Sequence, residues 1–200
     1  FYFPAARSRP RESAADCGPG NCLLDLLARR LFGLPYDRGG SRAAAGKVSQ
    51  RLLSLLLASP FFRGQIQSTG REVFGPVMEQ QVLDFGANHR LSAEDMLATV
   101  AELTSVGIVS HVWPIVRSDD SLEEIFVFGG GRKNAHIMRR LQHQLPDVAI
   151  RRIDELALNG DLVEAAAYAV MGEACIRGEA LDLGSSRRKM RAVCGRIVQE

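Results

Sequence analysis

The spacing of apolar residues predicts helices along most of the chain. Over residues 23–31, leucines recur three or four positions apart and therefore share one face of a helix. The same spacing recurs over residues 96–108 and 137–145, and each of these runs is long enough for two or more helical turns. A further helix is predicted over about residues 49–58, and an alanine-rich helix begins near Asp161.

Polar and helix-breaking residues set the ends of the longest predicted helix. Ser92 precedes its apolar run, and Asp95 follows three positions later, a pairing typical of a capping box. Gly107 falls in the helix interior, where glycine costs about 1 kcal/mol relative to alanine. Pro114 sets an upper limit to the length of this helix.

Short apolar runs predict the strands. Residues 125–128 form a continuous apolar run that suits a buried strand of a parallel sheet, and residues 148–150 form a second one. Because a predicted helix lies between them, the order strand, helix, strand favours a right-handed parallel pair. Ile197–Val198 is a last, short candidate. The sequence therefore predicts an α/β protein.

Glycine-rich and polar turns carry the candidate chemistry. Gly129–Gly131 follow the first predicted strand, and Asn134 is a suitable N-cap for the helix after them. A second turn, Asp-Cys-Gly-Pro-Gly-Asn, occupies residues 16–21. Backbone of this kind lets a nucleotide come close, but on the glycines alone a purely structural turn is favoured by about two to one. The polar turn at residues 67–72 has side chains that bind oxyanions or sugar hydroxyls, although most such turns are only solvated.

Composition and charge exclude several classes of protein. The 200 residues are 46% hydrophobic and 24% charged, with a net charge of +2 that gives no basic field for nucleic acid. Apolar runs such as residues 52–58 are too short to cross a bilayer, and no apolar leader opens the chain. The four cysteines have no metal-ligand spacing, so we expect reduced thiols in a cytoplasmic protein. Residues 1–15 lack any period and are expected to be a disordered lead-in to one domain over residues 16–200.

Short motifs follow one another in a specific order from residue 16 onward. The turn at residues 16–21 is followed by Gly-Leu-Pro-Tyr-Asp at 33–37, Ser-Thr-Gly-Arg-Glu at 68–72, Gly-Gly-Gly at 129–131, and Gly-Asp at 160–161. This ordered set resembles the C-terminal half of the anhydro-N-acetylmuramic acid kinase family, whose first turn reads Asp-Thr-Gly-Pro-Gly-Asn.

The resemblance implies a fold and a reaction. The fold is the second lobe of an actin-like, hexokinase-like ATPase, in which a ribonuclease H-like sheet is flanked by helices. The family uses ATP and Mg²⁺ and couples hydrolytic opening of a 1,6-anhydro ring to phosphorylation at O6, during recycling of cell-wall amino sugars. Asp16 would be the general base that takes a proton from the attacking water.

The resemblance also implies binding roles and a possible homodimer. The residues expected to bind the nucleotide are Gly18, Gly20, Asn21, Gly129, Gly130, Gly131 and Asn134. Those expected to bind the sugar are Ser68, Arg71 and Glu164. No residue is expected to be a protein ligand of a resident metal, and neither nucleic acid nor membrane is an expected partner.

Departures from the family pattern leave two functions open. Nothing in the chain resembles the family's N-terminal phosphate loop, and Cys17 stands where the family has threonine. Asp16 by itself is more often a turn residue, and Glu164 also suits a capping box with Asp161. Because such kinases clamp phosphates from both sides, the chain is either a partial kinase that needs a missing lobe or a catalytically inactive module that binds nucleotide or a partner. A lobe without its partner would expose a large apolar patch.

Overall fold

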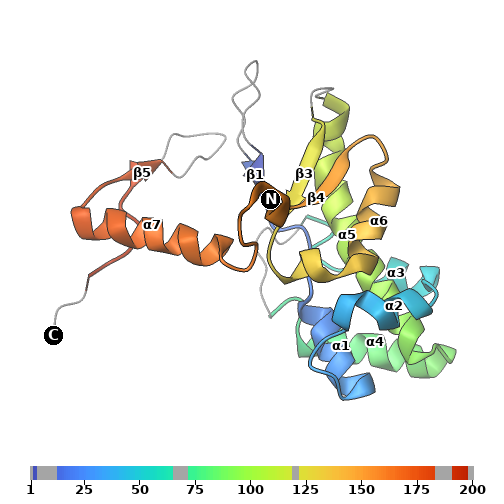
Figure 1. The fold of residues 1–200 in the computed structure, drawn as a ribbon. Coiled ribbons are helices and arrows are strands. Elements are labelled where there is room, and N and C mark those ends of the chain that lie inside the picture. Colours follow the sequence, from blue (N-terminus) through green and yellow to red (C-terminus); the bar gives the residue numbers. More distant parts are fainter. Residues whose placement is uncertain (1, 4–12, 65–71, 119–121, 183–190, 198–200) are drawn as a thin grey trace.

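Helices packed around one long central helix form the larger part of the chain (Figure 1). The computed structural model describes residues 2–3, 13–64, 72–118, 122–182 and 191–197. The central helix is α5 (Ala93–Ser118). It packs against α1 (Cys22–Phe32), α2 (Ser41–Ala45), α3 (Gln50–Leu57) and α4 (Pro76–His89), and a 3-10 turn, η1 (Arg38–Gly40), leads into α2. The predictions of helices over residues 23–31 and 49–58 are confirmed.

Apolar side chains of the predicted helices and of α4, a helix that the sequence analysis did not predict, build the core between them. Fully buried side chains come from α1, α3, α4 and α5, namely Leu23, Leu24, Leu27, Leu52, Leu56, Val82, Leu97, Val100 and Leu103. Burying each such side chain stabilises the fold by about 1.5–3 kcal/mol. On α5 the predicted buried face is confirmed, since Met96, Val100 and Leu103 are buried and Ile108 packs against the same core.

The start of α5 is fixed by the predicted capping box. Ser92 Oγ accepts a hydrogen bond from the Asp95 amide at 3.0 Å, and Asp95 Oδ2 accepts one from the Ser92 amide at 3.4 Å. The Lys47 amide also donates to the Asp95 carboxylate at 2.7 Å. That bond is the main reason why the pKa of Asp95 is lowered, so this carboxylate ties the chain after α2 to the first turn of α5.

The predicted limit at Pro114 is wrong, because α5 runs through the proline to Ser118. Val112, in the same stretch, is fully buried against Ile125 of the next strand and Val148, which precedes the strand after it, and this packing offsets the hydrogen bond that the proline removes. Residues 93–117 of this 26-residue helix are long and apolar enough to cross a membrane, with a mean hydropathy of 1.3 over an 18-residue window. However, 67% of its apolar window is buried inside the protein, as in a core helix.

A two-stranded parallel sheet lies beside the C-terminal half of α5. Strands β3 (Glu124–Val127) and β4 (Ala149–Arg152) pair in parallel with Ile125 opposite Ile150. Between them the chain forms η2 (Gly130–Lys133) and α6 (Ala135–Gln144), so the predicted strand–helix–strand unit and its parallel pairing are confirmed. Val112, Leu145 and Ile125 form a second, smaller core under this sheet. The α/β class is therefore correct.

The C-terminal part of the described chain extends away from the helical body (Figure 1). After η3 (Ile153–Leu156) comes α7 (Val163–Arg177), and then β5 (Leu181–Asp182) pairs antiparallel with β6 (Arg191–Ala192). Ile197 is not in a strand, and Val198 lies outside the described residues. At the other end, β1 (Tyr2–Phe3) pairs antiparallel with β2 (Ser13–Ala14), which ends two residues before Asp16.

Candidate functional site

The turn at residues 16–21 is bound to α5 through the carbonyl group of Gly20. Gly18 and Gly20 have φ angles of 152° and 55°, a region that favours glycine. The Gly20 carbonyl accepts a hydrogen bond of 2.8 Å from the hydroxyl of Thr104, which is buried on α5. Among the described residues, no backbone carbonyl accepts a hydrogen bond from the amides of Gly18 and Gly20. These two amides are therefore suited to bind an anion.

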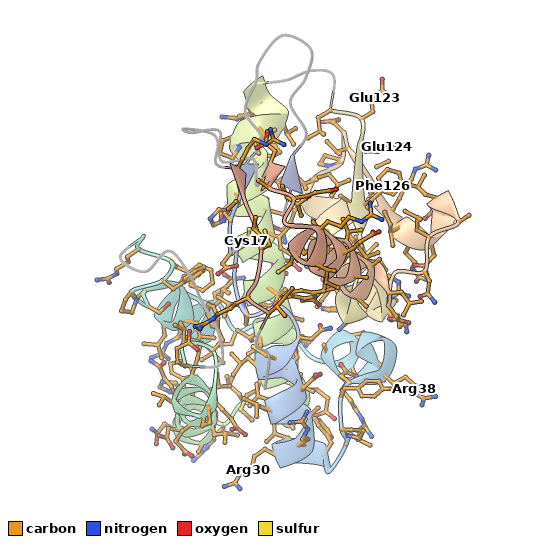
Figure 2. The ribbon with its side chains drawn as sticks, turned by 90° about the vertical axis from the view of Figure 1, so that its left-hand side faces the viewer. Cys17, Arg30, Arg38, Glu123, Glu124 and Phe126 are labelled. Carbon is orange, nitrogen blue, oxygen red and sulfur yellow. The ribbon has the colours of Figure 1, made fainter. Side chains whose placement is uncertain are left out.

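Gly107 lets this turn lie directly on the central helix. A Cβ atom at Gly107 would overlap the carbonyl oxygen of Cys17 and would lie 3.2 Å from the ring of Phe62. Figure 2 shows Cys17 beside α5. The Cys17 side chain is buried, and burial raises the pKa of its thiol to about 11, so the thiol stays protonated at neutral pH. The glycine that the sequence shows only as a cost to the helix thus has a packing reason.

The second glycine turn meets the first. Gly129 follows β3 with a φ of 71°, and its amide donates to the carbonyl of Gly160 at 2.9 Å. Cβ atoms at Gly130 and Gly131 would lie 3.4 Å and 3.9 Å from Asn21 Nδ2. The two turns that the sequence assigns to one nucleotide are therefore adjacent in the structure, although more than a hundred residues separate them.

Arg132 links the second glycine turn, residues 129–131, to the segment after β4. Its Nε donates to Asp154 Oδ2 at 2.6 Å, and its Nη1 donates to Asp161 Oδ1 at 2.6 Å and to the Gly129 carbonyl at 2.9 Å. The Arg132 side chain is only 4% exposed, and a Cβ at Gly160 would overlap it. The guanidinium thus joins the turn after β3 to the segment after β4 through charge-assisted bonds.

The electrostatics of this cluster follow from the same bonds. Hydrogen bonds from Arg132, and then from Lys133 at 2.5 Å, hold the pKa of Asp161 well below its usual range. The hydrogen bond from Arg132 likewise lowers the pKa of Asp154, and the two carboxylates raise the pKa of Arg132. Sequence reasoning gave Asp161 only a helix-capping role with Glu164, and it assigned no role to Asp154 or Arg132.

The remaining predicted site residues are not all brought together. The Asn134 side chain caps α6, as predicted, by accepting from the amides of His136 and Ile137 at 3.1 Å. Glu164 is exposed on the first turn of α7. The predicted capping box between Asp161 and Glu164 is wrong, because the Asp161 carboxylate is used by Arg132 and Lys133 and no side chain caps α7.

Several features limit what else the described residues can do. Ser68 and Arg71 lie outside the described residues. Within the described ranges, no three His, Cys, Asp or Glu side chains gather into a metal site. Mg²⁺ that arrives with a nucleotide needs only one or two carboxylates beside the phosphates.

A cavity of about 670 Å³ lies between α3 and α4, away from both glycine turns.

Comparison with known proteins decides which family this arrangement belongs to. The family model described as "Anhydro-N-acetylmuramic acid kinase" matches residues 8–187. The chain belongs to the anhydro-N-acetylmuramic acid kinase family. Proteins of that name from Cupriavidus metallidurans and Pseudomonas fluorescens are 38% and 40% identical to it over 176 and 165 residues, which is 88% and 82% of this chain. One from Salinibacter ruber is 33% identical over 92% of this chain.

These kinases are much longer than the chain. The matched regions cover 46%, 44% and 46% of the Cupriavidus metallidurans, Pseudomonas fluorescens and Salinibacter ruber proteins. The chain therefore spans a little under half the length of these relatives.

Proposed function

We propose that this chain is the part of an ATP-dependent sugar kinase that carries the general base and one side of the nucleotide site. The observation that carries the proposal is the meeting of the two glycine turns at Asn21, with Asp16 at the start of the first turn. The small parallel sheet that packs beside α5 and α6 is compatible with a lobe of an actin-like, hexokinase-like ATPase. Such a lobe works in the cytoplasm, where ATP is present.

The binding roles follow from the two turns. The amides of Gly18 and Gly20 would hold phosphate oxygens, because no backbone carbonyl of the described chain accepts from them. Gly130 and Gly131 would lie beside the adenosine, where the absence of side chains lets a flat ring approach the backbone. Arg132 holds that turn through its hydrogen bond to the Gly129 carbonyl. Asn134 would stabilise the turn indirectly, because its side chain caps the first turn of α6, which follows it.

The proposed reaction opens and phosphorylates 1,6-anhydro-N-acetylmuramic acid. Asp16 takes a proton from the water that attacks C1, the bond between C1 and O6 breaks, and O6 bonds to the transferred phosphorus. The phosphoryl group would come from ATP, whose bond between the γ-phosphorus and the bridging oxygen breaks so that ADP leaves, and Mg²⁺ would offset the phosphate charge. We assign the sugar contacts to Ser68, Arg71 and Glu164. In this scheme Asp16 acts only on water, so a variant at this position should keep its affinity for ATP.

Calorimetric titration with ATP and Mg²⁺ tests the nucleotide site. We expect a Kd in the micromolar to millimolar range, or about −8 to −4 kcal/mol. Gly130→Val should abolish binding, because its added methyl groups would fill the space beside Asn21. Asp16→Asn should leave binding intact, and Ala44→Val, on the exposed side of α2, serves as the bulk-matched control. No binding by the folded wild-type chain would refute the proposal.

A second function is favoured by the length of the chain. Kinases of this kind clamp the phosphates from both sides, whereas this chain matches less than half of its relatives. Alone, it would then be a module that binds nucleotide without turnover. Measurable phosphorylation of the sugar by the 200-residue chain alone would exclude this alternative.

A further inference from the structure

Helix α7 is apolar on nearly every side, although it lies apart from the helical body (Figure 1). Among its 15 residues, only Glu164, Glu173 and Arg177 are charged. A helix that is hydrophobic all round is normally buried in the interior of a protein. In this structure Ala174 is its one buried residue, and the chain after β6 approaches it at Cys175, whose Sγ would lie 3.2 Å from a Cβ at Gly195.

Exposed apolar side chains are concentrated around this helix. Of thirteen large hydrophobic side chains that are exposed in the described chain, eight lie between residues 156 and 197. On α7, Tyr168 is 64% exposed and Ile176 is 75% exposed. Their spacing of eight residues places both on one side of the helix, with Gly172 between them, roughly opposite Ala174. We call Tyr168, Gly172 and Ile176 the α7 face.

Gly172 differs from the other glycines inside the described α-helices. A Cβ at Gly86 would overlap the Met96 side chain, and a Cβ at Gly107 would overlap the Cys17 carbonyl, so close packing explains both. A Cβ at Gly172 would meet nothing within 4 Å. Because glycine in a helix interior costs about 1 kcal/mol relative to alanine, an open surface gives no reason for it. Close approach of another segment to this helix would explain the glycine at position 172.

The family relatives indicate which segment would approach Gly172. More than half of each relative has no counterpart in the chain. The sheet is also incomplete: parallel sheets are covered on both faces, yet β3 and β4 are its only described strands, and Phe128 just beyond β3 is 53% exposed. We propose that the α7 face binds the part of an anhydro-N-acetylmuramic acid kinase that this chain does not match, an inference that rests on the proposed function.

Co-expression tests the proposal directly. The affinity-tagged 200-residue chain is produced together with the unmatched part of the Cupriavidus metallidurans kinase, and the ratio of the two chains is measured after purification. Ile176→Asp and Gly172→Leu should each reduce capture roughly tenfold or more. Leucine is the better helix former, so lower capture by Gly172→Leu does not reflect a loss of helix α7. Val77→Asp, at an 82% exposed position on α4, should capture as much as wild type.

Each other outcome overturns the proposal or separates it from the proposed function. Equal capture by wild type and both α7 variants would overturn it, as would a loss confined to Val77→Asp. A chain that captures nothing, but forms a dimer that Ile176→Asp dissociates, would assign the α7 face to a second copy instead. Asp16→Asn should be captured like wild type, so a complex that forms but never phosphorylates the sugar would refute the proposed function and leave the docking intact.

Discussion

Gly107→Ala tests whether the candidate catalytic turn rests on α5. A Cβ–oxygen contact needs about 3.3 Å, and in the variant this atom would overlap the carbonyl oxygen of Cys17. The neighbouring ring of Phe62, 3.2 Å away, leaves the methyl group little room on its other side. The turn that begins at Asp16 would therefore have to move away from the helix by on the order of 1 Å.

The expected magnitude is the balance of two effects. Replacing glycine by alanine in a helix interior stabilises the helix by about 1 kcal/mol. Overpacking against a backbone carbonyl costs about 1–3 kcal/mol, so Gly107→Ala should lower the free energy of unfolding by roughly 0–2 kcal/mol. Gly172→Ala gains the same helix propensity with nothing in its way. The difference between the two variants therefore isolates the overpacking.

Urea unfolding followed by far-ultraviolet circular dichroism measures both variants. Gly172→Ala should keep or raise the unfolding midpoint and the helical signal, whereas Gly107→Ala should lower the midpoint. It should also weaken ATP binding, because the amides of Gly18 and Gly20 move together with Cys17. If Gly107→Ala were as stable as Gly172→Ala and bound ATP normally, the close approach of the turn to α5 would be refuted.

Three further predictions concern the contacts that hold the two glycine turns. Arg132→Gln should weaken ATP binding in calorimetry far more than Lys133→Gln, because only Arg132 also binds the carbonyl of the glycine turn. The folded-state pKa of Asp154 and of Asp161 lies below the unfolded value. Their contribution to the free energy of unfolding is therefore complete above about pH 4 and is lost as the pH falls further. The urea midpoint should drop in acid, and it should drop less steeply in Arg132→Gln. Thr104→Val removes a 2.8 Å hydrogen bond and should cost about 1 kcal/mol in urea unfolding, whereas an unchanged midpoint would show that the bond does not hold the turn.

Local patterns predict the elements well, because they depend on neighbouring residues. The leucine spacing in α1 and the Ser92–Asp95 capping box give the observed helix and the observed cap. The prediction that the helix ends by Pro114 was wrong, because the local penalty for proline is outweighed by packing of Val112 against Ile125 and Val148, which come later in the chain. Secondary structure is therefore predictable from this sequence up to the points where tertiary contacts override local preference.

The candidate site depends on distant contacts, which a single sequence does not reveal. The motif order identified both glycine turns, but neither their meeting at Asn21 nor the packing of Cys17 on Gly107 follows from any local pattern. Asp161 was assigned to a helix cap because Glu164 is near in sequence, whereas its partner Arg132 is 29 residues away. The role of Asp16 still rests on the family resemblance and stays a prediction.

The most direct test of the central claim is the rate of sugar phosphorylation by the captured complex with and without the Asp16 carboxylate. The chain is purified together with the unmatched part of the Cupriavidus metallidurans kinase and is given ATP, Mg²⁺ and 1,6-anhydro-N-acetylmuramic acid. We predict turnover by the wild type and a loss of roughly 10²–10⁴-fold in Asp16→Asn, with ATP affinity unchanged. Turnover by Asp16→Asn at the wild-type rate would contradict the account.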